Sequence, residues 1–175
     1  RMVPVSAVFN RFPRMVRDVS KELGKDINLT IEGEETELDR TVIDEIGDPI
    51  MHLLRNSLDH GVESPDDREA KGKPRTGEVG LIARHEGNNV VIMITDDGAG
   101  IDADKIRRKA VEKGMISQDE ADRLDDAEAV RLIFLPGFST AEQITDISGR
   151  GVGMDVVRSK IEALSGHVDV ETHID

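Results

Sequence analysis

The stretch TDDGAGID, residues 95–102, constrains this chain most, because it directly follows the apolar run VVIMI. A short apolar run of this kind indicates a buried strand, so two carboxylates and two glycines stand at a strand end. Glycine lets the backbone turn tightly and approach a ligand, yet carboxylates repel phosphate. A calcium loop of the EF-hand type is disfavoured, because Gly98 and Arg107 occupy two of its ligand positions. We therefore expect the loop to bind a group that offers hydrogen-bond donors.

The composition, with 37% apolar and 34% charged residues, indicates a soluble globular protein with a single domain over residues 1–175. The apolar stretches are far shorter than the roughly 18 residues of a membrane span. The net charge of −13 argues against nonspecific binding to nucleic acid or to anionic membranes, so an anionic ligand would need a locally positive site. The lack of cysteine excludes disulfides and thiol chemistry and suits the cytoplasm.

Periodicity and capping residues predict a mixture of helices and strands. Gly24 is expected to end the first long helix, and Pro49, after a capping Asp48, is expected to start a new helix and so break a longer helical region. The expected helices cover 12–24, 39–60, 103–113, 119–134 and 154–165, and the expected strands cover 26–33, 78–85, 90–96 and 167–173. This order predicts an α/β (α+β) two-layer sandwich, with a mixed, largely antiparallel sheet and helices on one face.

The helix expected to end near His60 has an unusual polar face. His52, Asn56, Asp59 and His60 gather on one side, opposite the apolar side. A solvated face would normally contain Glu, Lys, Gln and Arg, which are better helix formers. An Asn carbonyl and an imidazole one turn apart can bind a metal ion, and a histidine can accept a proton near neutral pH. From this helix alone, a solvated face and a metal or proton-transfer site both remain open.

Two more motifs follow in the second half of the chain. SGRGVGMDVV, residues 148–157, places three alternate glycines before a helix, where free backbone N–H groups and the helix dipole favour an anion. A plain glycine-rich connector is the alternative, since the stretch is neither a Walker loop nor a Rossmann fingerprint. In RLIFLPGFSTAEQITD, residues 131–146, Phe134 and Phe138 flank a Pro-Gly turn, which can simply fix a loop to the core.

The segments HLLRNSLDHG, DDGAGI, LIFLPGFST and SGRGVGMDVV occur in this order along the chain. They resemble the N box, first glycine box, F box and second glycine box of the Bergerat-fold ATPases and kinases. The chain is most similar to the ATP-binding catalytic domain of the chemotaxis histidine kinases, from MVPVSAVFNRFPRMVRD near its start to SGHVDV near its end. The resemblance implies a two-component kinase that transfers the γ-phosphate of ATP to a histidine on a separate phosphotransfer domain. A Bergerat-fold ATPase and a non-catalytic nucleotide-sensing module are the alternatives.

The resemblance also implies roles for single residues. Asp96 is expected to accept a hydrogen bond from the exocyclic amino group of adenine, which is a donor. Asn56 and His52 are expected to bind Mg²⁺, and His52 is the candidate catalytic residue. The other expected ATP contacts are Arg55, Asp59, His60, Gly98, Gly100, Ile101, Lys105, Ser139, Thr140, Gly149, Gly151, Gly153 and Met154. Asp97 matches no essential role of the family, so we interpret it as a turn or capping residue.

One position departs from the ATP-hydrolysing members of the family. They carry a Glu that activates water one turn before the N-box asparagine, and this chain has His52 there. We therefore expect slow hydrolysis, with His52 either assisting Mg²⁺ or accepting the proton of an attacking histidine. His85, His167 and His173 are expected to be structural or surface residues rather than phosphate acceptors.

The resemblance finally implies a domain organisation. Residues 1–10 are expected to be a linker from a preceding dimerisation domain, residues 114–148 a mobile ATP lid, and a final family strand is missing after Asp175. The expected partners are a histidine phosphotransfer domain, the dimerisation and receptor-coupling domains of the same kinase and, through them, a chemoreceptor array with its coupling protein. No nucleic-acid partner and no direct membrane insertion are expected, and the isolated domain is expected to be a cytoplasmic monomer.

Overall fold

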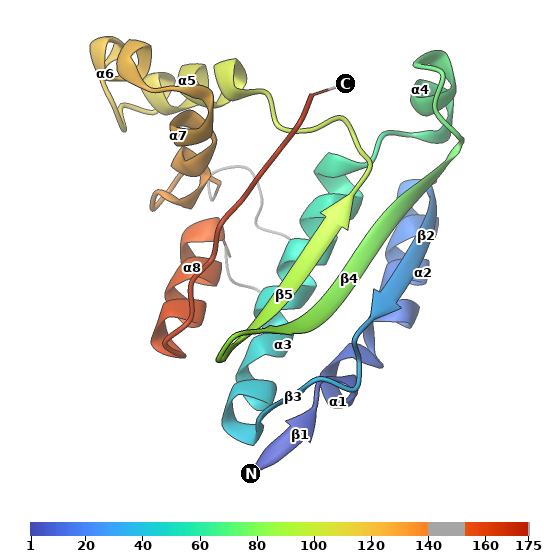
Figure 1. Ribbon diagram of the computed structural model, residues 1–175. Coiled ribbons are helices and arrows are strands. Elements are labelled where there is room, and N and C mark those ends of the chain that lie inside the picture. Colours follow the sequence, from blue (N-terminus) through green and yellow to red (C-terminus); the bar gives the residue numbers. More distant parts are fainter. Residues whose placement is uncertain (140–152, 175) are drawn as a thin grey trace. The chain divides into compact units, whose positions relative to one another are not determined.

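The computed structural model describes residues 1–139 and 153–174 (Figure 1). The chain divides into two compact units, Arg1–Ala99 and Gly100–Asp175. Among the described helices, none is long and apolar enough to cross a membrane.

The first unit is built on a three-stranded sheet in the order β2-β4-β5. Strand β2 (Asp26–Glu32) runs parallel to β4 (Thr76–Glu86), and β4 runs antiparallel to β5 (Asn89–Asp96). The β4–β5 hairpin turns at Gly87, which has φ of +61° and so needs the freedom of glycine. The predicted strand and hairpin are confirmed, and the sheet is mixed as expected.

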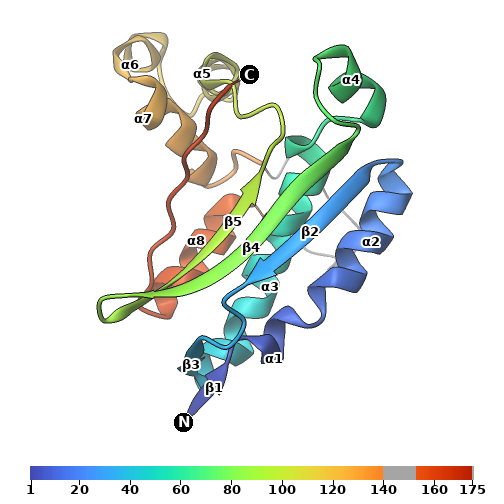
Figure 2. The same ribbon diagram turned by 45° about the vertical axis from the view of Figure 1, so that its right-hand side comes forward.

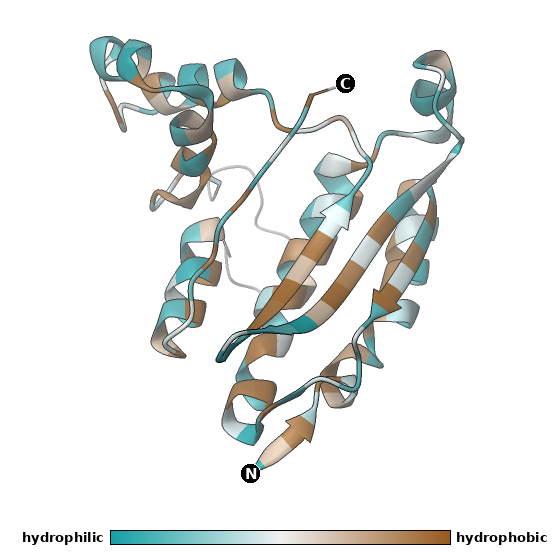
Figure 3. Ribbon diagram, in the orientation of Figure 1, coloured by the Kyte–Doolittle hydropathy of each residue, from teal (hydrophilic) through white to brown (hydrophobic). Residues whose placement is uncertain are grey.

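Two long helices cover one face of this sheet, as Figures 1 and 2 show from two directions. They are α2 (Phe12–Leu23), which ends at Gly24 in the left-handed conformation, and α3 (Arg40–Asn56), which continues into a π turn, η1 (Ser57–Gly61). Hydrophobic and hydrophilic residues alternate along β2 (Figure 3), and buried and less buried residues alternate along much of β4, so one face of the sheet packs against the helices. The buried core includes Phe9, Phe12, Leu54, Leu58, Val79 and Leu81. The predicted two-layer arrangement is confirmed.

The N-terminal residues belong to the first unit. Strand β1 (Met2–Pro4) pairs antiparallel with β3 (Glu37–Asp39), and α1 (Ser6–Phe9) follows β1. Val5, Val8 and Phe9 are buried, and the Phe9 ring lies 6.3 Å from the ring of Phe12. The segment 1–10, expected to be a linker, therefore contributes β1, α1 and three buried side chains to this unit. A short helix, α4 (Pro65–Ala70), precedes β4.

The predicted helix break at Pro49 is wrong, because Pro49 lies inside the continuous helix α3. A proline in a helix interior costs about 3 kcal/mol. The same helix buries Ile43, Ile46, Ile50 and Leu54 on one face, and each such side chain contributes about 1.5–3 kcal/mol. Burial along the whole face therefore outweighs the lost backbone hydrogen bond.

The second unit contains α5 (Ala103–Glu112), α6 (Gln118–Arg123), α7 (Asp126–Val130), a 3-10 turn η2 (Arg131–Phe134) and α8 (Met154–Ala163). Ala103, Ala129 and Val130 form a small core with Val170 and other neighbours. Helices α5 and α8 confirm two predictions.

Two predictions in this unit are wrong. The helix expected over 119–134 is divided, because Asp125 and Glu128 form a capping box that starts α7 afresh after Leu124. The strand expected over 167–173 is not formed, although Thr172 accepts a hydrogen bond from the Ile101 N–H at 2.8 Å. A strand requires a partner ladder, and alternation in the sequence does not supply one. Of the expected lid, residues 140–148 lie outside the described part of the chain.

Candidate functional site

The two consecutive carboxylates at the end of β5 lie on opposite faces of the sheet. Asp96 is opposite Val79 in the ladder and therefore points to the helix-covered face. Its carboxylate lies beside Gly61, where an added Cβ would be 2.9 Å from Asp96 Oδ2. Asp97 points to the other face, where Oδ1 accepts a hydrogen bond from the Glu78 N–H at 2.9 Å. The two side chains therefore have different surroundings and different uses.

The turn after Asp96 fixes one oxygen of its carboxylate. Oδ1 accepts a hydrogen bond from the Gly98 N–H at 2.9 Å, and the Asp96 residue is exposed. The Ala99 N–H donates to the Gly61 carbonyl at 3.0 Å, so the turn crosses η1 closely. A Cβ on Gly98 would collide with that carbonyl, which explains the glycine. The Asp96 carboxylate is thus fixed by a hydrogen bond and lies beside two residues without side chains, Gly61 and Gly98.

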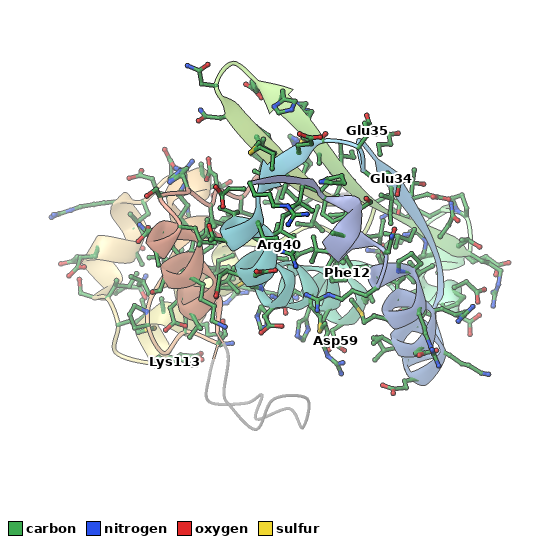
Figure 4. The ribbon with its side chains drawn as sticks, turned by 90° about the horizontal axis from the view of Figure 1, so that it is seen from below. Phe12, Glu34, Glu35, Arg40, Asp59 and Lys113 are labelled. Carbon is green, nitrogen blue, oxygen red and sulfur yellow. The ribbon has the colours of Figure 1, made fainter. Side chains whose placement is uncertain are left out.

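The end of α3 and the π turn η1 carry the polar residues expected from the sequence. Leu54 and Leu58 are buried in the core, while His52, Asn56 and Asp59 are half-buried on the other side. Figure 4 labels Asp59, whose Oδ2 lies 3.8 Å from Arg55 Nε. Because these residues share a helix end with Gly61, the first unit brings His52, Arg55, Asn56, Asp59 and His60 onto the element that contacts Asp96.

Burial lowers the pKa of His52, and the nearby charge of Arg55 lowers this pKa further. The imidazole is therefore neutral at pH 7, which leaves a nitrogen lone pair for a proton or a metal ion. Arg55 Nε is buried and has no hydrogen-bond partner among the residues that the structure describes. A buried guanidinium nitrogen of this kind favours an anionic ligand.

The π turn is held by a residue that sequence reasoning missed. Lys25 Nζ donates to the carbonyl oxygens of Leu58 at 2.7 Å and Asp59 at 3.0 Å. Burial lowers the pKa of Lys25, while the charges of Asp59 and Glu63 oppose this effect. A π turn leaves carbonyls without their usual helical partners, and Lys25 satisfies two of them. It is a positioning residue for the end of α3.

In the second unit, the expected site residues lie on three segments. Gly100 has φ of +81°, and Asp102 caps α5, on which Lys105 is exposed. Gly153 begins α8 without a side-chain cap among the described residues, and Met154 is buried. Ser139 is half-buried. Thr140, Gly149 and Gly151 lie outside the described residues.

Phe138, next to Ser139, is held by α5. The Lys113 Nζ, labelled in Figure 4, donates to the Phe138 carbonyl at 2.6 Å and to the Gly137 carbonyl at 3.2 Å. The Lys109 ammonium lies 4.9 Å from the centre of the Phe138 ring, a cation–π contact. The Pro-Gly turn of this motif is therefore tied to α5 by two lysines. Nothing in the local sequence distinguishes these lysines from their exposed neighbours.

The comparisons with known proteins agree with this arrangement. Residues 45–175 match the family described as histidine kinase-, DNA gyrase B-, and HSP90-like ATPase. The chain belongs to this family. It is 61% identical to the chemotaxis protein CheA of Bacillus subtilis over 98% of its own length, and 55% identical to the sensor histidine kinase CheAY of Helicobacter pylori over 99%. It is also 55% identical to the CheA of Listeria monocytogenes over 98% of its length.

These relatives are much longer than the chain. The chain covers 26% of the Bacillus subtilis protein, 22% of the Helicobacter pylori protein and 28% of the Listeria monocytogenes protein. The matched region is therefore about a quarter of each relative's length.

Proposed function

We propose that this chain is the ATP-binding catalytic domain of a chemotaxis histidine kinase and that it supplies the γ-phosphate of ATP to a histidine on a separate phosphotransfer domain. The observation that carries the proposal is the Asp96 carboxylate, which is held by the Gly98 N–H at 2.9 Å beside the helix end that bears Asn56 and His52. The proposed hydrogen-bond acceptor for adenine, Asp96, and the candidate metal ligands, Asn56 and His52, thus belong to elements that contact each other at Gly61.

Adenine recognition follows from the donors and acceptors. The exocyclic amino group of adenine is a donor, and the Asp96 carboxylate accepts only. A purine with a carbonyl at the same place would put two acceptors together, and the site would reject it because the Asp96 carboxylate has no hydrogen to donate. Gly61 and Gly98 leave the carboxylate uncovered by side chains, so a flat base can approach it.

The residues present also fit a magnesium ion. No group of three or more His, Asp or Glu side chains suitable for a metal occurs among the described residues. Mg²⁺ commonly takes one or two protein ligands and completes its octahedron with phosphate oxygens and water. Asn56 would hold the ion, and His52, one turn earlier, would be either a second ligand or a base. When bound, the ion would offset the negative charge of the ATP phosphates. This matters here because the protein itself has a net charge of −13.

His52 is the candidate base for phosphotransfer. Its lowered pKa keeps the ring neutral at pH 7, so it can accept the proton of an attacking histidine. A carboxylate is the stronger activator of water in the ATP-hydrolysing members of the family, so hydrolysis by this chain should be slow. The nucleotide contacts of Arg55, Asp59, His60, Gly100, Ile101, Lys105, Ser139, Thr140, Gly149, Gly151, Gly153 and Met154 belong to the same proposal.

The wider setting is also part of the proposal. The kinase would contain dimerisation and receptor-coupling domains and would act in the cytoplasm, below a chemoreceptor array. Similarity to the CheA proteins over nearly the whole chain supports this setting.

The decisive experiment is transfer of labelled terminal phosphate from ATP to a separately added phosphotransfer domain that bears the acceptor histidine. We expect an acid-labile, base-stable phosphohistidine on the added domain, formed slowly because no tether raises the effective concentration. The Asp96→Asn variant is the control and should give none. Rapid hydrolysis by the chain alone, without transfer at high acceptor concentration, would replace the kinase proposal with an ATPase.

A further inference from the structure

A buried arginine binds the loop that follows Asp96. Arg68, on α4, is 1% exposed, and its Nε donates to the Pro74 carbonyl at 2.7 Å. Its Nη2 donates to Asp97 Oδ2 at 3.0 Å, and its Nη1 donates to the Asp97 carbonyl at 3.2 Å and to Glu63 Oε1 at 3.1 Å. The guanidinium thus holds both the side chain and the main chain of Asp97.

A lysine reaches the same place from the loop after α4. Lys73 Nζ donates to the carbonyls of Asp97 at 3.0 Å and Gly98 at 3.1 Å, and to Glu63 Oε2 at 2.9 Å. The Glu63 carboxylate therefore bridges the two cations, and its side chain is only 8% exposed. We call Glu63, Arg68, Lys73 and Asp97 together the Arg68 clamp.

The clamp acts on Asp96 through a single peptide group. The carbonyl of Asp97 and the N–H of Gly98 belong to one planar unit, in which they point in opposite directions. Arg68 and Lys73 bind the carbonyl end, and the N–H end donates to Asp96 Oδ1 at 2.9 Å. Two cations on the carbonyl therefore fix the direction of the N–H and strengthen it as a donor.

Stability alone does not require a buried ion-pair cluster of this kind. Burying a charged group carries a large desolvation penalty, and well-packed apolar residues often replace buried ion pairs without loss of stability. Arg68 nevertheless uses all three of its nitrogens on partners that surround one turn. Such an arrangement restricts orientation, which an apolar replacement cannot do.

We propose that the Arg68 clamp is a positioning device that orients the Asp97–Gly98 peptide and so holds the Asp96 carboxylate in one orientation. The clamp thereby sets the selectivity for adenine over purines that carry a carbonyl in place of the amino group. This inference rests on the proposed ATP site. An Asp96 side chain that could rotate would turn away from a carbonyl and accept the wrong base more easily. Fixing the side chain keeps the repulsion in force.

The test measures the dissociation constants of ATP and inosine triphosphate by calorimetry. The ratio of the inosine triphosphate constant to the ATP constant gives the selectivity for adenine. Inosine triphosphate has a carbonyl where ATP has the amino group, and its ribose and phosphates are the same. The variants are Lys73→Met, which keeps the length of the side chain, and Asp97→Asn, which keeps its shape. Arg75→Gln is the matched control, because Arg75 lies in the same loop but pairs with the exposed Asp66 and Glu69.

We expect the ratio to fall by about two- to tenfold in Lys73→Met and Asp97→Asn, the range that one hydrogen bond contributes. It should stay at the wild-type value in Arg75→Gln. A loss of folding stability weakens both nucleotides equally and leaves the ratio unchanged, so the ratio separates positioning from stability. The Asp96→Asn variant gives the ratio of dissociation constants in the absence of the Asp96 carboxylate.

Two outcomes overturn the inference and can be told apart. If the wild type prefers ATP and both clamp variants keep its ratio, the clamp has no positioning role and the ATP site stands. If the wild type binds both nucleotides equally or binds neither, the proposed adenine site fails and the clamp proposal falls with it.

Discussion

The substitution Glu63→Gln tests the charge of the Arg68 clamp. Burial raises the pKa of the Glu63 carboxyl, but hydrogen bonds and charge from Lys73, with a further hydrogen bond from Lys71, outweigh burial and lower this pKa from 4.5 to about 2. Lys73 lies 2.9 Å and Lys71 3.3 Å from Oε2. The glutamine keeps the size of the side chain and removes its charge. The variant should therefore be less stable at neutral pH.

The size of the effect follows from the pKa. A difference of about 2.5 pKa units corresponds to about 3 kcal/mol of unfolding free energy at pH 7. Because the folded-state pKa is depressed, this contribution is fully present above pH 4.5 and is lost as the pH falls towards about 2. At pH 3 the same relation leaves about 1.4 kcal/mol. These values are upper limits, because Lys71 is 44% exposed and solvent screens its charge.

The assay is denaturant unfolding of wild type and variant between pH 7 and pH 3, followed by circular dichroism. The difference in unfolding free energy should be largest at pH 7, should begin to shrink below about pH 4.5 and should have lost roughly half or more of its size at pH 3. Glu69→Gln is the control, because Glu69 is exposed and pairs only with Arg75 among the ion pairs described for it. Parallel curves of unfolding free energy against pH for wild type and Glu63→Gln would refute the reasoning. The Glu63 charge would then not be the source of the difference in stability.

Three further substitutions test the nucleotide site and its support. Asp96→Asn should weaken ATP binding severely in calorimetry and leave the thermal melt almost unchanged; near-normal affinity would exclude Asp96 as the adenine acceptor. Asn56→Ala should reduce nucleotide affinity more with Mg²⁺ than without it, whereas equal losses would indicate a structural role. Lys25→Met should lower the unfolding free energy by about 1–3 kcal/mol, because it leaves the carbonyls of Leu58 and Asp59 without their donor; an unchanged denaturant midpoint would contradict this.

The elements predicted correctly are those whose signals are local. Helix α2 begins with Pro13 in its first turn and ends at Gly24 with φ of +65°, and α5 begins after the capping Asp102. The β4–β5 hairpin has two strands rich in apolar residues on either side of a short turn. Helix α3 passes through Pro49 because burial along its whole face outweighs a local stop signal. The pairing of β1 with β3 joins segments about 35 residues apart, and no periodicity within three residues can announce it.

The same distinction holds for the candidate site. The sequence predicts Asp96, Gly98 and Asn56 as site residues because each lies in a motif with several residues in a fixed order. Lys25 reaches the carbonyl of a residue 33 positions away, and Arg68 reaches Asp97 across 29 positions. Arg68 and Arg75 look alike in the sequence, yet one is 1% exposed and the other has 51% of its side chain exposed. Tertiary packing alone separates them.

The structure accounts for how an anionic ligand could lie near two adjacent aspartates. Strand alternation sends Asp96 and Asp97 to opposite faces, so only one carboxylate faces the helix end at Gly61. The other is paired with the Arg68 guanidinium at 3.0 Å, and Lys73 adds a second cation on the Asp97 carbonyl. A shift of the β4–β5 register by one residue would exchange the two roles and would leave Arg68 without its carboxylate. The Glu78–Asp97 hydrogen bonds, which extend the ladder past Asp96, therefore help to decide which aspartate serves the ligand and which serves the fold.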